Sequence, residues 1–325
     1  MTTSTRLLGV AAGATALVVL TVAVVILARP DAGRPTGSPD AARAQGELHT
    51  SQPLPGRVEA TLGVVSFNAL QYQELSHAAE DWERLASHPN VDLIGWQETK
   101  SPPFRKLYPQ YRSRGWETWY WPDPDGPIQL AISWRTSQLE LLDVSFDKVH
   151  LGDYPRETDS PFPARWVVVA QFRHRHTGHA VTLVNTHVNQ HIETPSGSFR
   201  DNLNARRAKQ HLARLAVGWR STPGDVVVGT GDYNFDHVSD VEAEPAGGIT
   251  RTFRGLASSS YDVLGLDGLL PTRNRRWIDY VFLADRTMRS RRNPDGVAQF
   301  QRHRVLSGYH SDHAPLLTRI RLYAD

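Results

Sequence analysis

The sequence predicts an α/β fold in which two mixed β-sheets pack together with helices on the outside. Runs of β-branched and apolar residues, typical of strands buried on both faces, alternate with helical patterns that begin near residues 74 and 199. Several strand-like runs follow one another without a helix between them, which argues against a simple doubly wound parallel sheet. With 325 residues, 40% of them hydrophobic, the chain can bury a substantial core.

Charge and cysteine content narrow the function classes. The chain has 36 basic and 34 acidic residues and a formal net charge of +2, so recognition of a polyanion must be local. The absence of cysteine excludes disulfides, thiolate catalysis and Cys-based zinc sites, but leaves the compartment open.

An apolar segment near the start of the chain indicates a membrane anchor. After a short tail, residues 1–6, the run from Leu7 to Ala28 has 22 uncharged residues and is long enough to span a bilayer. We predict a transmembrane anchor or uncleaved signal; the alternative is a cleaved signal peptide, whose apolar region is usually shorter. The basic residues after the run favour a cytoplasmic domain, whereas the short tail with one arginine favours export. We expect the folded domain to be extracytoplasmic, since large domains translocate largely regardless of charge.

The composition then changes from a tether to a globular domain. Residues 29–57 are rich in Pro, Gly, Ala and Ser and predict a disordered tether. The folded domain is expected to begin near Val58 and to occupy residues 58–325.

Eight strands and two helices are predicted within this domain. The helices cover residues 74–88 and 199–219, and the second places Ala208, Leu212, Leu215 and Trp219 on one face. The strands are "LGVVSF" (62–67), "VDLIGW" (91–96), "QLAISW" (129–134), "RWVVVAQF" (165–172), "AVTLVNT" (180–186), "DVVVGT" (225–230), "WIDYVFLA" (277–284) and "APLLTRIRL" (314–322).

Polar residues gather at the ends of these strands. Asp279 lies inside an otherwise apolar strand. It needs a partner, because burying an unpaired carboxylate costs on the order of several kcal/mol or more. Each polar residue taken singly has a structural explanation, as a turn former, a helix cap or a satisfied histidine. Taken together they are harder to explain structurally. The eight residues are Asn68, Glu98, His187, Asp232, Asn234, Asp279, Asp312 and His313.

Six short motifs that contain these residues resemble those of the endonuclease/exonuclease/phosphatase superfamily. They are "SFN", "WQE", "NTH", "GDYN", "IDYV" and "SDH", in the family's order and approximate spacing. This superfamily includes deoxyribonuclease-I-like nucleases, neutral sphingomyelinases and inositol polyphosphate phosphatases. The resemblance implies a four-layer α/β sandwich that hydrolyses phosphoester bonds. Tyr233 stands where the family often has Phe, a change that leaves the chemistry intact.

The resemblance implies a divalent metal ion. Glu98 would be the main ligand, with Asn68 and Asp312 completing or positioning the site. Mg²⁺, or Mn²⁺ in its place, suits these residues because hard oxygen ligands are preferred and one or two carboxylates suffice.

The same resemblance implies roles for the remaining polar residues. His313 would be the general acid/base partner, held in its tautomer by Asp279. His187 and Asn234 would donate hydrogen bonds to the phosphoryl oxygens, and Asp232 would orient the attacking water or accept its proton. Which histidine activates water stays open at this point.

Substrate recognition has weaker signals in the sequence. Arg135 and Arg165 are candidate phosphate contacts, although a solvated surface arginine is the more ordinary explanation for each. A locally basic region, 273–304, can track a nucleic-acid backbone, face anionic lipid or be a solvated loop. The aromatic residues of "GWETWYWPDPDG" (115–126) can stack on bases, sit at a lipid interface or pack in the core.

From these observations we predict a membrane-tethered, Mg²⁺-dependent phosphodiesterase, with nucleic acid as the leading substrate. The alternatives are a phospholipid or sphingomyelin phosphodiesterase, or a phosphatase, and, in another class, a binding module that has lost its chemistry. The intact motifs disfavour the binding module. We expect a monomer.

Overall fold

The computed structural model describes residues 51–152 and 164–324. Its strands form two six-stranded sheets, ordered β11-β12-β1-β2-β4-β3 and β5-β6-β7-β8-β10-β9. The strands are β1 (Val58–Asn68), β2 (Leu93–Gln97), β3 (Trp116–Tyr120), β4 (Ala131–Arg135), β5 (Leu139–His150), β6 (Arg165–His174), β7 (Ala180–His187), β8 (Val226–Asp232), β9 (Ala257–Ser259), β10 (Asp279–Ala284), β11 (Ala298–Val305) and β12 (Leu316–Tyr323).

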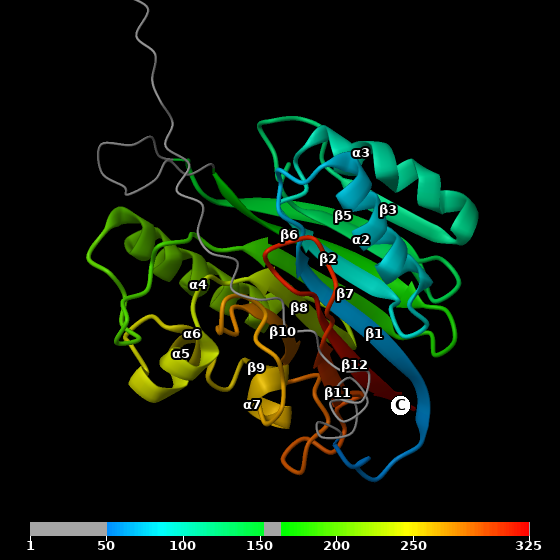
Figure 1. The fold of residues 1–325 in the computed structure, drawn as a ribbon. Coiled ribbons are helices and arrows are strands. Elements are labelled where there is room, and N and C mark those ends of the chain that lie inside the picture. Colours follow the sequence, from blue (N-terminus) through cyan, green and yellow to red (C-terminus); the bar gives the residue numbers. More distant parts are fainter. Residues whose placement is uncertain (1–50, 153–163, 325) are drawn as a thin grey trace, which may run out of the picture. The chain divides into compact units, whose positions relative to one another are not determined.

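Helices cover the outer faces of the two sheets (Figure 1). Trp82 of one helix packs with Phe67 and Trp96 on the outer face of the first sheet, and Leu212 and Trp219 of another pack on the second sheet. The helices are α2 (Leu75–Ser87), α3 (Pro102–Leu107), the 3₁₀ helix η1 (Tyr108–Arg114), α4 (Leu203–Ser221), α5 (His237–Ala243), α6 (Ile249–Phe253) and α7 (Ser260–Leu264). The prediction of two packed mixed sheets flanked by helices is confirmed.

All eight predicted strands are present, and the four strands that were not predicted are the edges of the two sheets. These are β11 and β3 in the first sheet and β5 and β9 in the second. An edge strand is exposed along one side, so its residues are often polar or its length short. β5 shows this, because most of its positions are partly or fully exposed.

Strand direction brings the polar strand ends to one edge. β1 and β2 run parallel, and so do β7 and β8, so the carboxyl ends of each pair meet. In the second sheet His187 lies opposite Asp232, and Asp232 lies opposite Asp279 at the start of antiparallel β10. β12, which follows His313, begins at the same edge because it pairs antiparallel to β1. This edge therefore collects residues distant in the sequence.

The segment that precedes β1 also makes defined contacts. Its described part, residues 51–57, was expected to belong to a disordered tether. The Ser51 backbone N–H donates to the Gln301 carbonyl, and the Leu54 N–H donates to the Tyr323 hydroxyl at 3.0 Å. These residues thus hydrogen-bond to β11 and β12.

The predicted anchor, residues 7–28, and most of the tether lie outside the described residues. Among the helices of the described ranges, none has the length and apolar character needed to cross a membrane.

Candidate active site

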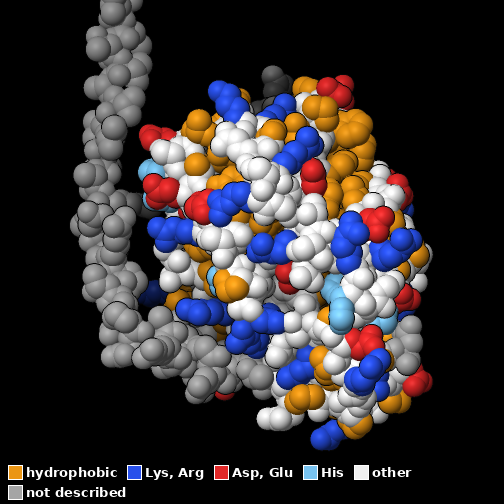
Figure 2. All heavy atoms as spheres, turned by 90° about the vertical axis from the view of Figure 1, so that its right-hand side faces the viewer, with side chains coloured by type: hydrophobic (Ala, Val, Ile, Leu, Met, Phe, Trp, Pro, Cys, Tyr) orange, Lys and Arg blue, Asp and Glu red, His pale blue; other side chains and the backbone are white. Residues whose placement is uncertain are grey.

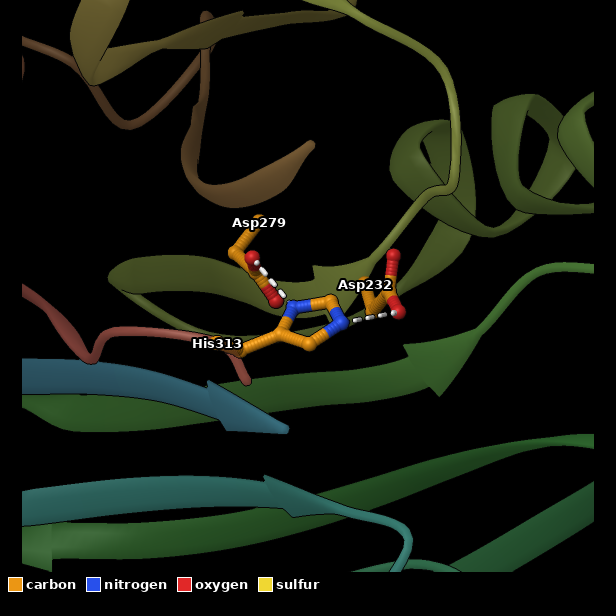
Figure 3. Close-up of side chains that lie close together, drawn as sticks. All are labelled: Asp232, Asp279 and His313. Carbon is orange, nitrogen blue, oxygen red and sulfur yellow. Dashed lines mark hydrogen bonds and ion pairs between the residues drawn. The ribbon is translucent and has the colours of Figure 1, made fainter. Parts of the chain in front are cut away.

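A buried imidazole between two carboxylates forms the centre of the polar edge (Figure 3). His313 Nδ1 donates to Asp279 Oδ2 at 2.8 Å, and its Nε2 lies 3.7 Å from Asp232 Oδ2. All three side chains are almost completely buried. Asp279, suspicious in the sequence because it interrupts an apolar strand, thus has the partner that its burial requires.

The charges of this trio follow from their neighbours. Burial alone would lower the pKa of His313, but the carboxylates of Asp279 and Asp232 raise it to about 9. Burial would likewise raise the pKa of Asp232, but His313 and His187 hold it well below its usual range. At neutral pH His313 is therefore a cation and Asp232 an anion. A protonated imidazole cannot accept a proton, so Asp232 is the better base in this arrangement.

His187 lies on the other side of Asp232. Its Nε2 is 3.4 Å from Asp232 Oδ2 and 4.0 Å from Glu98 Oε1. Its Nδ1 lies 3.3 Å from Nη1 of Arg165, which can only donate, so Nδ1 accepts and a neutral ring carries its proton on Nε2. The proton of His187 then points toward the two carboxylates. Asn234 places its Nδ2 3.3 Å from His187 Nε2 and donates to the Val188 carbonyl.

Glu98 and Asn68 form the oxygen-rich part of the site. Asn68 Nδ2 donates to Glu98 Oε1 at 3.2 Å and to Asp232 Oδ2 at 3.0 Å, so one amide bridges the two carboxylates. Burial raises the pKa of Glu98, but His187 and Asn68 outweigh burial and keep the pKa below its usual value. Glu98 has a φ of 61°, a left-handed conformation that is uncommon for this residue type and typical of functional sites.

These residues fit a divalent cation by the chemistry of their donor atoms. Glu98 and Asp232 are two anionic carboxylates held by the same amide, and the side chain of Glu98 keeps 21% of its surface exposed at the mouth. A hard cation would offset their repulsion, and the carboxylate of Glu98 supplies a ligand of the right kind. The amide oxygen of Asn68 accepts from the Leu70 N–H.

Asp232, Asp279 and His313 have atoms within 4.8 Å of one another and form a second metal-ligand candidate. The imidazole of His313 lies between the two carboxylates and its Nδ1 donates to Asp279, so we assign this trio to acid–base chemistry.

Two of the predicted residues have other partners in the structure. Asp312, expected to be a metal ligand, pairs with Arg273: its Oδ2 lies 2.6 Å from Nη2 of Arg273. Arg135, expected to contact phosphate, lies at the far end of β4, because β4 runs antiparallel to β2. Its guanidinium donates to the carbonyls of Val91, Ala86 and His88 and lies over the ring of Trp116.

Arg165, the other candidate, lies within the site. Its Nη1 donates to Gln129 Oε1 at 2.6 Å as well as facing His187, and its side chain is buried. Burial lowers its pKa to about 10, so it stays charged at neutral pH.

The basic region 273–304 does not form one surface. Arg273 and Arg276 lie beside the site, Arg286 donates to the carbonyls of Thr222 and Gly224, and Arg302 and Arg304 lie in a separate hollow. On the face drawn in Figure 2, basic and acidic side chains are interspersed rather than arranged in a stripe.

The aromatic residues of segment 115–126 mostly pack against other side chains of the protein. Trp116 is buried in the core, and Trp119 and Trp121 contact Phe146 of β5. Core packing therefore accounts for much of this cluster.

The sequence analysis did not pick out the residues that support the site. Asn185 joins the two sheets: its amide donates to the Trp96 and Ala131 carbonyls and accepts from Gln97 and Thr230. A Cβ on Gly95 would lie 2.0 Å from Thr230 Oγ1, so only glycine allows this close approach. The available signal was a set of polar residues inside otherwise apolar strands.

Two hollows flank the residues of this site. One, of about 350 Å³ including space open to solvent, has Pro127, Ile128 and Trp166 in its lining and reaches His187 and Arg165. The other, of about 680 Å³ and open to solvent, is lined by three arginines next to Asn234: Arg200, Arg273 and Arg276. Arg276 pairs with the buried carboxylate of Glu193, which anchors the guanidinium. The site thus has one mainly apolar side and one basic side.

The fold and the site define an α/β sandwich whose polar edge carries carboxylate, imidazole and amide side chains. No family model matches the sequence, and no curated protein matches it significantly. Among solved structures, it is similar to the human Nocturnin catalytic domain with bound sulfate (15% identity, TM-score 0.56, 81% of this chain and 94% of that chain). It is also similar to D. rerio TDP2 complexed with a single-strand DNA product (16% identity, TM-score 0.59, 81% and 99%).

A third similar structure is an endonuclease/exonuclease/phosphatase family protein from Bacteroides thetaiotaomicron (16% identity, TM-score 0.56, 81% and 98%). The chain therefore has the endonuclease/exonuclease/phosphatase fold, and the predicted resemblance is confirmed at the level of the fold.

Proposed function

We propose that this chain is a divalent-metal-dependent phosphodiesterase and that its substrate is nucleic acid. The observation that carries the proposal is the convergence, at one sheet edge, of the hydrogen-bonded Glu98–Asn68 pair with the Asp279–His313–Asp232 trio. Phosphodiester hydrolysis needs positive charge on the phosphate, an oriented water and a group that accepts its proton.

Each residue has a distinct part in this reaction. A divalent cation, Mg²⁺ or Mn²⁺, supplies charge to the phosphoryl oxygens when bound, and Glu98 and Asn68 would hold it. Asp232, ionised and buried, accepts the proton of the attacking water. As the water oxygen bonds to phosphorus, the bond from phosphorus to the leaving oxygen breaks, and His313, kept cationic by Asp279, gives its proton to that oxygen. His187 donates a hydrogen bond through Nε2–H to a phosphoryl oxygen and stabilises the negative charge that develops there.

The two hollows support a nucleic-acid substrate. Arginines match phosphate groups geometrically, so the basic hollow beside Asn234 suits the phosphate adjacent to the scissile one. The mainly apolar hollow with Trp166 and Ile128 suits a flat base. The similar TDP2 structure holds a single-strand DNA product.

We further propose that residues 7–28 anchor the protein in a membrane with the catalytic domain outside the cytoplasm, and that the protein acts as a monomer. The apolar run of the sequence supports the anchor. Protease treatment of intact cells should then degrade the domain, and protection in intact cells but not in lysed cells would contradict this orientation.

A substrate panel tests the activity. The full chain in neutral detergent should cleave single-stranded or double-stranded oligonucleotides with Mg²⁺ or Mn²⁺ and lose this activity in EDTA. Turnover of a phospholipid or sphingomyelin without cleavage of either oligonucleotide would replace the nuclease proposal by the lipid phosphodiesterase alternative.

A pair of dinucleotides tests the basic hollow. Thymidylyl-thymidine with a terminal phosphate should have a KM about tenfold lower than the same compound without it, since one charge-assisted contact contributes about 1.4 kcal/mol or more. Arg273→Gln should abolish this difference. Arg275→Gln is the matched control, because Arg275 lies in the same turn, is exposed and does not line the hollow. Equal KM values for both compounds in the wild type would contradict the role of the hollow.

A further inference from the structure

A second group of cations lies away from the polar edge that carries the candidate active site (the catalytic edge). Arg302 and Arg304 of β11, Arg319 of β12, and His88 and Asn90 after α2 line a solvent-open hollow of about 410 Å³. Through β12, Arg319 lies opposite Gly63 of β1, five residues before Asn68. The hollow is therefore about 17 Å along the strand from the catalytic edge. Leu317, another lining residue, belongs to the core under α2, which places the hollow on the outer face of the sheet.

The cations of this hollow outnumber the negative charges near them. No Asp or Glu is among the described residues that line it. Within the described chain, Nε of Arg304 and Nε of Arg319 are buried without a hydrogen-bond partner. Arg319 otherwise donates to Asn90 and Thr61, which are neutral. The nearby carboxylate of Asp92 is used by the Gly63 N–H at 2.8 Å and lies 3.8 Å from Arg135.

The strand register forces like charges together. Arg302 and Arg319 are direct partners across the antiparallel β11–β12 ladder, an arrangement that destabilises a sheet. Burial, followed by the arginines around it, lowers the pKa of His88. Burial and Arg302 also lower the pKa of Arg319. A sheet edge needs no such cluster for folding, and most other arginines in the described chain have an acidic or carbonyl partner, as Arg214 has in Asp147.

We propose that this hollow binds a phosphate-type oxyanion, either free phosphate or the phosphate of a lipid headgroup, at a site separate from the catalytic edge. Three guanidinium groups and an imidazole from three segments surround a space that a tetrahedral anion would fill. The anion would pair with the guanidinium groups of Arg302 and Arg304 and offset the repulsion between Arg302 and Arg319.

The test uses the full chain in neutral detergent with EDTA and measures the titration of the His88 imidazole by NMR. Inorganic phosphate should raise the pKa of His88 relative to chloride at equal ionic strength, because a bound anion favours the charged ring. The His88 signal is identified by its loss in His88→Gln. This readout is local, so phosphate that binds near His313 does not contribute to it.

Variants separate a built site from general screening. The double variant Arg302→Gln/Arg304→Gln should weaken phosphate binding at least about tenfold. Arg291→Gln/Arg292→Gln, a pair of exposed arginines in the preceding loop, is the matched control and should bind as the wild type does. Arg302→Glu places a carboxylate opposite Arg319; it should raise the urea midpoint in chloride and abolish the response to phosphate.

Two sources of the phosphate group are distinguished by a second arm. Mixed micelles that carry phosphatidic acid are compared with micelles that carry phosphatidylcholine and with inorganic phosphate. A shift of His88 at lower phosphate concentration in phosphatidic acid micelles assigns the headgroup, and an equal or weaker response assigns the free ion. The proposal is overturned if His88 shifts equally in chloride and phosphate, or if the double variant binds phosphate as the wild type does.

Discussion

The catalytic edge and the hollow of Arg302, Arg304 and Arg319 (the arginine hollow) both hold several buried or half-buried charges. The two clusters balance these charges differently. At the catalytic edge each carboxylate faces an imidazole or an amide of the same chain, as Asp279 faces His313. In the hollow Arg302 faces Arg319, and no lining residue of the described chain is acidic. Internal balance keeps groups in fixed protonation states, which acid–base chemistry needs, whereas an unbalanced cluster stays available for an external anion.

The largest expected effect comes from removing the charge of Glu98. Glu98→Gln preserves shape but weakens the proposed metal site, so kcat on a phosphodiester should fall by about three orders of magnitude, equivalent to several kcal/mol. Calorimetry should show a parallel loss of Mg²⁺ affinity. Glu117→Gln is the control: Glu117 lies on the edge strand β3, where it pairs with Arg112. This variant should leave kcat and the Mg²⁺ affinity unchanged. An active Glu98→Gln enzyme with normal Mg²⁺ affinity would remove Glu98 from the site.

Asp279→Asn tests whether internal balance sets the charge of His313. The amide cannot stabilise an imidazolium as a carboxylate does, so kcat should fall about 10²- to 10⁴-fold with the fold retained. The pKa of His313, about 9 in the wild type, should drop toward the ordinary histidine value. Asp285→Asn, at the far end of β10, is a control that should change neither quantity. A His313 pKa that stays near 9 in Asp279→Asn would show that Asp232 alone sets it.

A buried histidine outside both clusters, His174, has its pKa shifted downward, opposite to that of His313, and we expect a smaller effect from its replacement. His174 is buried, has no acidic partner in the described chain, and burial lowers its pKa to about 4. Because the folded-state pKa is below the ordinary value of roughly 6.5, its stability contribution is present above pH 6.5 and lost as pH falls toward 4. His174→Asn should reduce the loss between pH 7 and pH 5 by on the order of 1 kcal/mol, allowing for solvent screening. Urea midpoints at the two pH values measure this, and an unchanged difference would refute it.

The smallest expected effect concerns the segment that pairs with the edge strand carrying the hollow. Fragments beginning at Ser51 and at Val58 should both fold and remain soluble, because the core lies after Val58. The shorter one should be less stable by about 1–2 kcal/mol, since it loses the Ser51–Gln301 and Leu54–Tyr323 hydrogen bonds. Equal melting temperatures would mean that this segment contributes nothing to β11.

The site was predictable where chemistry and burial coincide in the sequence. Asn68, Glu98, His187, Asp232 and Asp279 each end, begin or follow a buried apolar run, and parallel strand pairs bring such positions to one edge. Arg135 ends a similar run, but its strand is antiparallel to β2, so its side chain lies at the opposite end. Strand direction is a property of the whole sheet, and a single strand does not reveal it.

The sequence by itself determined the interior strands and the two main helices, because their burial imposes apolar runs and periodic faces. Only the tertiary structure decided the four edge strands, the pairing of Asp312 with Arg273, and the meeting of Arg302 with Arg319. An edge strand carries no complete burial pattern, and a cross-strand contact depends on register between segments distant in the chain. These features arise from the pairing of strands and are therefore absent from any one stretch of sequence.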